Sequence, residues 1–192
     1  MLDKIIKIDQ DVFLYFNQFN SSFFDNVMYW VSHPLFWIPL YLFFFYLLFK
    51  KFGLKPMLVM VILIGVTFAL TDLISVELFK KVFERLRPSH EPKLEGLVHL
   101  VDNYRGGQFG FVSSHAASVF GLATVMTLLL FKEIKRFWIF VFLWAILVSY
   151  SRLYLGVHYP LDLICGGILG MSIGLLMFTI FKRFNILGSK FN

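Results

Sequence analysis

The chain has 192 residues, 58% of them hydrophobic, and a mean hydropathy of +0.74. Soluble domains are usually about 45–50% apolar, so the composition excludes an ordinary soluble domain. Several sequence windows approach the ~20 apolar residues that cross a bilayer. The sequence therefore predicts an integral membrane protein. The net charge of +6 does not indicate nucleic-acid binding, because the basic residues fall at the ends of apolar segments, where anionic lipid and the positive-inside bias account for them.

Residues 1–32 are predicted to form an amphipathic, aromatic-rich segment. Charged residues such as Lys4 and Asp9 come early, and a series of phenylalanines mixed with Asn and Ser follows them. A segment of this kind is typical of a helix that lies in the membrane interface. The alternative is a first transmembrane span at residues 10–30.

The first clear spans come next. Residues 34–49 are aromatic and uncharged, and they end at two lysines. A longer helix is predicted to open near Pro56, since proline is tolerated in the first turn of a helix, and to continue to about Leu86. It should end there because Arg87 precedes a proline, and a residue in that position avoids the helical region.

Residues 88–112 are polar and contain glycines, and they are predicted to be a loop that forms a lid or an entrance rim. His90 and His99 in this loop are expected to be solvated. Arg105, beside two glycines, is a candidate for shaping the entrance to a headgroup site.

Three further helices complete the pattern. Ser113 can cap a helix with its apolar body at residues 116–131. A span follows at residues 137–150, and Pro160 opens the last span, which runs to Phe181. The predicted fold is therefore all-α, a polytopic membrane helix bundle of five or six transmembrane helices with an N-terminal amphipathic interfacial segment.

The predicted helices sort the charged residues to two ends of the bundle. Basic turns lie at residues 50–55, 132–136 and 182–183, and the positive-inside rule places them in the cytoplasm. Three polar clusters then face the extracytoplasmic side. The whole chain, residues 1–192, is predicted to be one domain, with the helix bundle at residues 34–183.

The first cluster is Lys80 with Arg87. Seven residues are nearly two helical turns, so both side chains would face the same way, about 10 Å apart along the axis, and could converge on one anion. The alternative is a basic fringe, shared with Lys81 and Arg85, that anchors the end of the helix.

The second cluster is Ser113-Ser114-His115 at a helix start. Free backbone N–H groups and the helix dipole favour a phosphate there, and two hydroxyls and an imidazole add hydrogen-bonding groups. The alternative is an ordinary N-cap followed by a histidine on the helix surface.

The third cluster joins Arg152, His158 and Asp162. The arginine can grip an oxyanion with its fork of donors, and Asp162 can orient the imidazole of His158 and stabilise its cation. His158 is therefore a candidate nucleophile or base. The alternative is an interfacial histidine beside a helix-start aspartate that the dipole stabilises.

Together, the three clusters place cationic side chains, hydroxyls, two histidines and a carboxylate at one membrane face. They resemble the three-part signature of the type 2 phosphatidic acid phosphatases, the PAP2 superfamily of membrane lipid phosphatases related to the vanadium haloperoxidases. The three parts here are Lys80-x6-Arg87-Pro88, Ser113-Ser114-His115 and Ser151-Arg152-x5-His158-x3-Asp162. The middle part departs from the family's usual Pro-Ser-Gly-His, because Val112 replaces the proline and Ser114 replaces the glycine.

The resemblance implies hydrolysis of a lipid phosphate monoester or diphosphate without a metal or another cofactor. It implies that His158 attacks phosphorus and forms a phosphohistidine, that Asp162 holds the ring of His158, and that His115 protonates the leaving oxygen. The implied phosphate-binding residues are Lys80, Arg87, Ser113, Ser114 and Arg152. Substrates of the family include phosphatidic acid, phosphatidylglycerophosphate, undecaprenyl pyrophosphate and lipid A phosphates.

The sequence thus predicts a multi-pass protein of the bacterial inner membrane with its active site on the periplasmic face. Its expected partners are a lipid phosphate substrate and membrane lipids, with no nucleic acid, and its oligomeric state is left open. The main competing function is a transporter or flippase that binds a lipid headgroup without hydrolysis, since charges inside membranes are common there too. A haloperoxidase-like activity with bound vanadate and a non-enzymatic scaffold are less favoured, because the pattern suits an amphiphile at a bilayer and the three clusters occur together.

Overall fold

Helices make up most of the protein. The computed structural model describes residues 2–131 and 134–184, and that part of the chain contains helices and short helical turns but no strand, only an isolated bridge. The helices are α1 (Leu2–Asn17), α2 (Ser22–Ser32), α3 (Ile38–Phe52), α4 (Leu54–Ile74), α5 (Lys81–Phe83), α6 (Ser114–Leu130), α7 (Phe137–Tyr154) and α8 (Pro160–Arg183). The all-α prediction is therefore confirmed.

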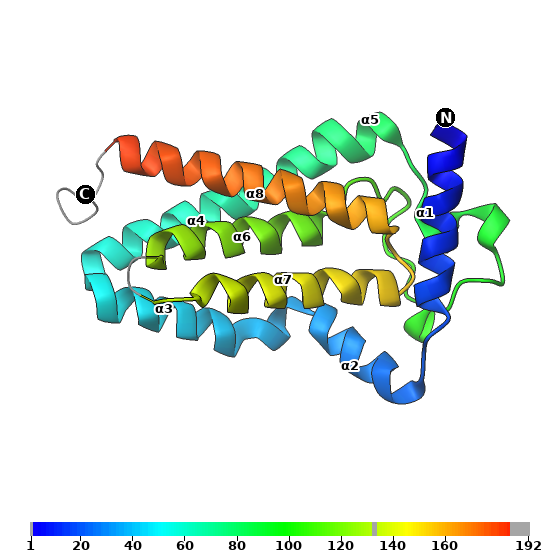
Figure 1. Ribbon diagram of the computed structural model, residues 1–192, viewed down its shortest axis with the longest axis horizontal. Helices are drawn as coiled ribbons and strands as arrows, with labels where there is room; N and C mark the ends of the chain where they lie inside the picture. Colours follow the sequence, from blue (N-terminus) through cyan, green and yellow to red (C-terminus); the bar gives the residue numbers. More distant parts are fainter. Residues whose placement is uncertain (1, 132–133, 185–192) are drawn as a thin grey trace.

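The long helices lie side by side as a bundle (Figure 1). Among the described residues, four helical segments are long and apolar enough to cross a membrane: Pro34–Phe52, Leu54–Phe83, Phe137–Tyr154 and Pro160–Arg183. Helix α6 is apolar but shorter, with 17 residues, and it packs against α4, α7 and α8 in the middle of the bundle. Its central place explains why much of α6 is buried in protein.

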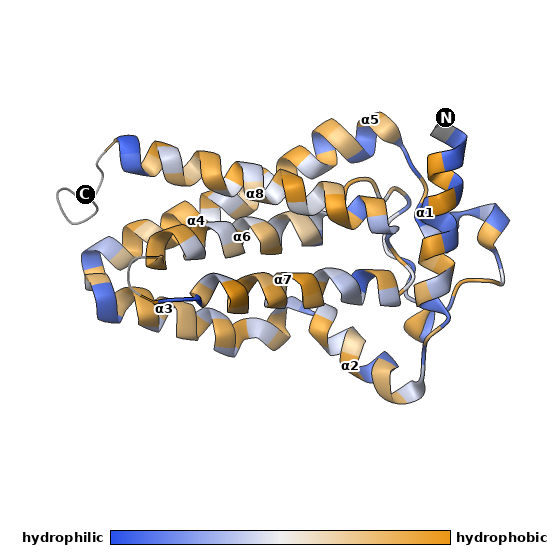
Figure 2. Cartoon of the chain, viewed as in Figure 1, coloured by the Kyte–Doolittle hydropathy of each residue, from blue (hydrophilic) through white to orange (hydrophobic). Residues whose placement is uncertain are grey.

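The N-terminal segment divides into two short helices. Residues 10–30 divide between α1 and α2, which have 16 and 11 residues, and neither is long enough for the ~20 residues that a span needs. In Figure 1, α1 crosses the end of the bundle at a steep angle to the long helices. Hydrophobic and hydrophilic residues alternate along α1 in Figure 2, as expected for an interfacial helix.

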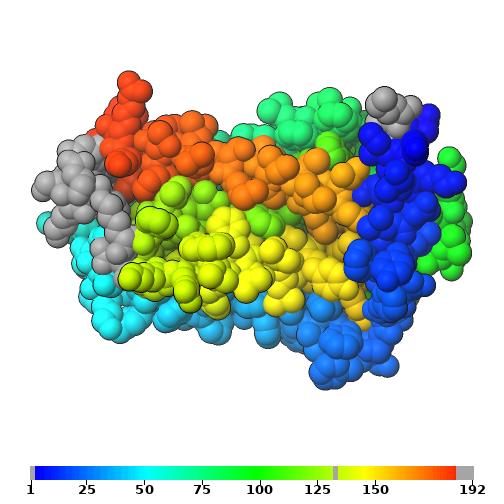
Figure 3. Space-filling view, viewed as in Figure 1, coloured from blue at the N-terminus to red at the C-terminus, as the bar shows by residue number. Residues whose placement is uncertain are grey.

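Helix α1 is fixed to the bundle by specific contacts. The Asn17 side-chain amide donates to the carbonyl oxygen of Tyr154 at 3.0 Å, and its own oxygen accepts the N–H of His99 at 2.7 Å. The fully buried ring of Phe13 meets the ring of Tyr159 edge-on, with centroids 5.5 Å apart. The space-filling view shows α1 lying over the ends of the adjoining helices (Figure 3).

The helix that begins at Leu54 ends earlier than its sequence pattern predicts. It includes a π-helical turn, Ser75–Lys80, and stops at Phe83 instead of Leu86, because Glu84 takes a left-handed backbone conformation with φ of 44°. The chain then pairs with residues 108–110 through backbone hydrogen bonds. Arg87 therefore lies beyond the helix, and the prediction that it shares a helical face with Lys80 is wrong.

The charged residues separate to the two ends of the bundle as predicted. The α3–α4 turn, the α6–α7 turn and the end of α8 lie at one end in Figure 1, and Figure 2 shows hydrophilic residues there. These segments carry the basic residues Lys50, Lys51, Lys55, Lys135, Arg136, Lys182 and Arg183, whereas Lys132 is outside the described residues. The α7–α8 connection and the 88–112 loop lie at the opposite end.

Helices α6 and α8 approach each other closely along a line of small residues. Gly166, Gly170 and Gly174 repeat every four residues on α8 and face α6. A Cβ atom at Gly170 would lie 2.0 Å from the carbonyl oxygen of Ala117. Small residues at this spacing let membrane helices meet backbone to backbone, and this contact sets the distance between the polar ends of the two helices.

Candidate active site

His158 and Asp162 are joined by the local structure of the α8 N-terminus. Pro160 occupies the first turn of the helix, and one carboxylate oxygen of Asp162 accepts the backbone N–H of Tyr159 at 3.0 Å. The same oxygen lies 3.3 Å from Nδ1 of His158. Asp162 therefore closes the helix start and fixes the orientation of the imidazole, as its spacing predicts.

The other ring nitrogen of His158 faces the cations. Its Nε2 lies 3.1 Å from a terminal guanidinium nitrogen of Arg87. Only 1% of His158 is exposed; burial first, and then the charges of Arg87 and Arg152, hold the pKa of its imidazole well below the usual range. The ring is therefore neutral at neutral pH, with Nδ1 turned to the carboxylate and Nε2 available as an electron-pair donor.

Arg87 is held in place by the backbone around it. Its guanidinium donates to the carbonyl oxygens of Phe109 at 3.2 Å and Val157 at 3.3 Å. Burial, with repulsion from Arg152, lowers the pKa of Arg87 to about 10, so the group stays charged at neutral pH. Glycine suits position 106, because the backbone there has a φ of 65° and an added Cβ would lie 2.9 Å from this guanidinium.

Lys80 reaches the start of α6 from the π-helical turn of the preceding span. Its ammonium donates to the hydroxyl of Ser114 at 2.7 Å, and the Ser75 hydroxyl lies 2.6 Å from the same oxygen. Ser113 is engaged within the protein: its hydroxyl accepts the Ala116 N–H, and its own N–H donates to the Asp162 carbonyl at 3.0 Å. Ser113 thus ties α6 to α8, and Ser114 is the serine that touches a cation.

Arg152 carries a donor with no partner. Its terminal nitrogens donate to the hydroxyls of Ser32 and, at 3.2 Å, of Tyr104. Its Nε is buried without a hydrogen-bond partner among the described residues. An unsatisfied buried donor costs free energy, and an anion beside Arg152 would remove that cost.

His115 lies where the cationic cluster opens into cavities. The side chains of Arg152, Arg87 and Lys80 are near enough for their charges to act on it. His115 lines a cavity of about 280 Å³ with Arg152 and a second of about 430 Å³ with Ser114. The second cavity shares Pro34, Tyr41 and Phe68 with an apolar groove of about 490 Å³ between α3 and α4. The cavity beside the histidine and the apolar groove are therefore neighbours that share part of their walls.

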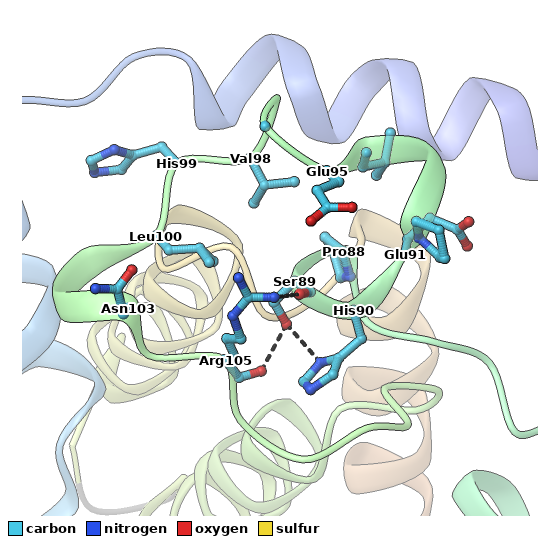
Figure 4. A pocket seen from close by; sticks show the side chains of 13 residues that line it. Pro88, Ser89, His90, Glu91, Glu95, Val98, His99, Leu100, Asn103 and Arg105 are labelled. Carbon is cyan, nitrogen blue, oxygen red and sulfur yellow. Dashed lines mark hydrogen bonds between the residues drawn. The ribbon is translucent and has the colours of Figure 1, made fainter.

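The 88–112 segment is a loop, as predicted, and it is tied together internally. Figure 4 shows Ser89 and Arg105 next to each other among the residues that line a pocket of about 460 Å³. The Arg105 guanidinium donates to the Ser89 carbonyl at 2.9 Å, and the Ser89 hydroxyl donates to the Arg105 carbonyl at 2.7 Å. His99 is not a freely solvated residue, because its Nε2 lies 2.9 Å from a carboxylate oxygen of Asp25 on α2.

Three residues that the sequence pattern did not single out join the site. Arg85 lies 3.0 Å from Asp162 and 2.7 Å from Asp9 on α1, and Tyr104 contacts Arg152. The pairing of Asp9 and Arg85 joins residues 76 positions apart, so no local spacing reveals it. The motif beginning at Lys80 does contain Arg85, and that is the one available signal.

Comparison with known proteins identifies the family of this chain. A sequence model described as the PAP2 superfamily matches residues 56–186. The chain belongs to the PAP2 superfamily. A lipid A 4'-phosphatase of Bacteroides thetaiotaomicron is 39% identical over 94% of this chain and 80% of that protein, and one of Porphyromonas gingivalis is 31% identical over 94% and 75%.

A solved structure agrees with the fold of this PAP2 protein. The crystal structure of a PAP2-type phosphatidylglycerolphosphate phosphatase from Bacillus subtilis superposes with a TM-score of 0.69 and 23% identity, covering 98% of this chain and 90% of that one. With the family established, the protein is a multi-pass membrane lipid phosphatase of bacterial type. The alternative of a transporter or flippase is not supported.

Proposed function

We propose that this PAP2 protein removes a phosphate group from a glycolipid of the lipid A type. The similarity to lipid A 4'-phosphatases covers 94% of the chain, whereas the family match covers residues 56–186. The likeness therefore extends well into the N-terminal quarter, which includes α1 and α2 at the mouth of the site. On this proposal, residues 1–192 act as one domain.

The observation that carries the chemistry is the buried His158 between a carboxylate and a cation. With Nδ1–H donating to Asp162, the lone pair of Nε2 is directed toward Arg87. When a phosphate enters, its oxygens take over the donors of Arg87, and Nε2 is free to attack phosphorus. The P–N bond forms as the P–O bond to the lipid breaks, and Asp162 stabilises the positive charge that develops on the ring.

His115 and the cations serve the leaving group and the phosphoryl oxygens. The negative charge of the bound phosphate offsets the surrounding cations and lets His115 take up a proton from solvent. His115 gives this proton to the departing lipid oxygen and then takes one from the water that hydrolyses the phosphohistidine. Lys80, Arg87 and Arg152 neutralise the phosphoryl oxygens, a task that fixed cations perform well in a site with little water. Ser114 adds a hydroxyl, and Ser113 holds the α6 N-terminus in place. This set of charges supports hydrolysis without a metal ion.

The orientation follows from the separation of charges. The basic turns lie at the end of the bundle opposite the site, so the positive-inside rule favours a site on the periplasmic face of the inner membrane. The headgroup would lie among the cations while an acyl chain occupies the apolar groove between α3 and α4. A lipid could then enter sideways without leaving the bilayer.

The proposal is tested with purified protein in detergent and a panel of lipid phosphates with a chelator present. The panel contains lipid A bearing the 4'-phosphate, phosphatidic acid, phosphatidylglycerophosphate and undecaprenyl diphosphate. We expect the fastest phosphate release from lipid A and none from His158→Ala. A higher kcat/KM on another member would overturn the substrate, and full activity of His158→Ala would overturn the nucleophile. Inhibition by the chelator would overturn the metal-free mechanism.

A further inference from the structure

Arg85 is the only guanidinium in the described part of the chain that bridges two buried carboxylates. One terminal nitrogen lies 3.0 Å from Oδ1 of Asp162, and the other lies 2.7 Å from Oδ2 of Asp9. Asp162 is fully buried and Asp9 is 4% exposed. The guanidinium carbon also lies 4.2 Å from the centre of the Tyr159 ring. Contacts with α1 and with the start of α8 thus fix this one side chain.

The two oxygens of Asp162 have separate partners. Oδ2 serves His158 and the Tyr159 N–H, while Oδ1 faces Arg85. A carboxylate held on one oxygen by a charged, planar donor has little freedom to rotate. Arg85 therefore controls the direction in which Asp162 presents its other oxygen to the imidazole.

Asp9 brings helix α1 into this arrangement. Its Oδ1 accepts the backbone N–H of Leu161 at 2.9 Å, in the first turn of α8. Its Oδ2 takes the second nitrogen of Arg85. Burial raises the pKa of the Asp9 carboxyl, although Arg85 opposes this shift. A buried acid on a mostly exposed interfacial helix needs such partners, since an unpaired charge there would be costly.

We propose that Asp9 and Arg85 are positioning residues for the phosphatase reaction: α1 holds Arg85, Arg85 holds Asp162, and Asp162 orients His158. The proposal rests on the assignment of His158 as nucleophile. It makes the N-terminal interfacial helix part of the catalytic machinery, although α1 lies outside the region that the family match covers. Neither residue touches the phosphate, so each acts on the rate of attack through the imidazole.

The charges also predict opposite pH effects for the two residues. Asp162 interacts electrostatically with several ionisable groups around it, namely Asp9, Lys80, Arg85, Arg87, Tyr159 and Cys165. His158 is also hydrogen-bonded to Asp162. Without the cation of Arg85, the Asp162 carboxylate acts on His158 unopposed and favours the protonated imidazole, so the acid limb of the kcat/KM profile moves to higher pH. Removing the anion of Asp9 moves it to lower pH. A residue that only stabilises the fold would not produce shifts of opposite sign.

The variants are Arg85→Gln, Arg85→Lys and Asp9→Asn, with Asp11→Asn as control because Asp11 is exposed on the same helix. We expect Arg85→Gln to lower kcat about 100-fold with little change in KM, and Arg85→Lys to recover part of this loss. Asp9→Asn should lower kcat several-fold. The acid limb of the kcat/KM profile should move to higher pH in Arg85→Gln and to lower pH in Asp9→Asn. Asp11→Asn should match the wild type.

Unchanged kcat and pH profile in Arg85→Gln would overturn the proposal, as would shifts of the same sign in the two charge-removing variants. Thermal unfolding of each purified variant shows whether it is folded. If Arg85→Gln does not fold, the proposal is tested by comparing Asp9→Asn with Asp11→Asn. Equal kcat values and equal pH profiles in these two variants would overturn the proposal. Wild-type turnover and its loss in His158→Ala are measured in the same assay. Failure of those two arms refutes the proposed function, whereas failure of the Arg85 and Asp9 arms alone refutes only the positioning role.

Discussion

A single methyl group at Gly170 should separate two helices that the active site needs close together. The Cβ of an alanine there would lie 2.0 Å from the carbonyl oxygen of Ala117 and 2.8 Å from its carbonyl carbon, whereas real Cβ atoms stay beyond 3.0 Å. The obstacle is backbone, so no rotamer change can relieve it. Helices α6 and α8 must therefore move apart by about 1 Å, an overpacking that typically costs about 1–3 kcal/mol.

The displacement reaches the chemistry because α6 carries His115 and α8 begins beside His158. The hydrogen bond from the Ser113 N–H to the Asp162 carbonyl, 3.0 Å long, joins the two helices at that point. We expect Gly170→Ala to lower kcat by about 100-fold, the effect of a misplacement of about 1 Å, and to lower the Tm in detergent by about 5 °C. The kcat is measured from phosphate release, and the Tm is measured by thermal unfolding.

The control for stability is Gly65→Ala on α4, where an added Cβ meets no atom within 4 Å. Its Tm should equal or slightly exceed that of the wild type, because alanine favours a helix over glycine by about 1 kcal/mol. A Gly170→Ala protein with wild-type kcat and Tm would show that close contact between the two helices does not set the geometry of the site.

Three further outcomes are expected. His115→Ala should lower kcat on a lipid phosphate by about 100-fold or more but have far less effect on an aryl phosphate whose leaving group needs no proton; equal losses on both would argue against the acid role. The Tm of the wild type should fall as the pH decreases below about 6.5, because unfolded His158 then takes up a proton that the buried imidazole, with its lowered pKa, refuses. This stability is fully present above the unfolded pKa, and His158→Asn should flatten the curve; parallel curves would contradict the reasoning. Asn17→Ala should lower the free energy of unfolding by about 1–3 kcal/mol by leaving buried backbone groups unpaired, compared with less than about 0.5 kcal/mol for Asn20→Ala, whose side chain makes only local bonds.

Local sequence pattern predicted the helices well where hydrophobicity or a turn residue controls them. The start of the last span at Pro160, the cap at Ser113 and the loop after Arg87 all agree with the structure. The error at the end of the second span has a physical cause. A left-handed residue at Glu84 and backbone pairing with residues 108–110 compete with a further helical turn, and neither is encoded in hydrophobic periodicity.

The candidate site shows the same division. His158 and Asp162 are four residues apart at a helix start, so their contact follows from local geometry. The sequence predicted that Lys80 and Ser114 belong to the same site, but it did not predict their direct contact, because the two residues belong to different helices. The sequence allowed Arg85 to be interpreted only as part of a basic fringe at the helix end. No residue near it in the sequence indicates a specific partner, and Asp9, with which it forms an ion pair, lies on a distant helix.

The sequence alone determined that this protein spans a membrane, and it predicted the long apolar segments and the gathering of cations and histidines at the end opposite the basic turns. These properties depend on transfer of side chains between water and hydrocarbon, which each segment satisfies independently of the others. Only the tertiary structure decided that α1 lies across the site and supplies Asp9, and that glycines bring α6 and α8 together. Those features depend on the packing of segments far apart in the chain, where a displacement of about 1 Å changes the chemistry.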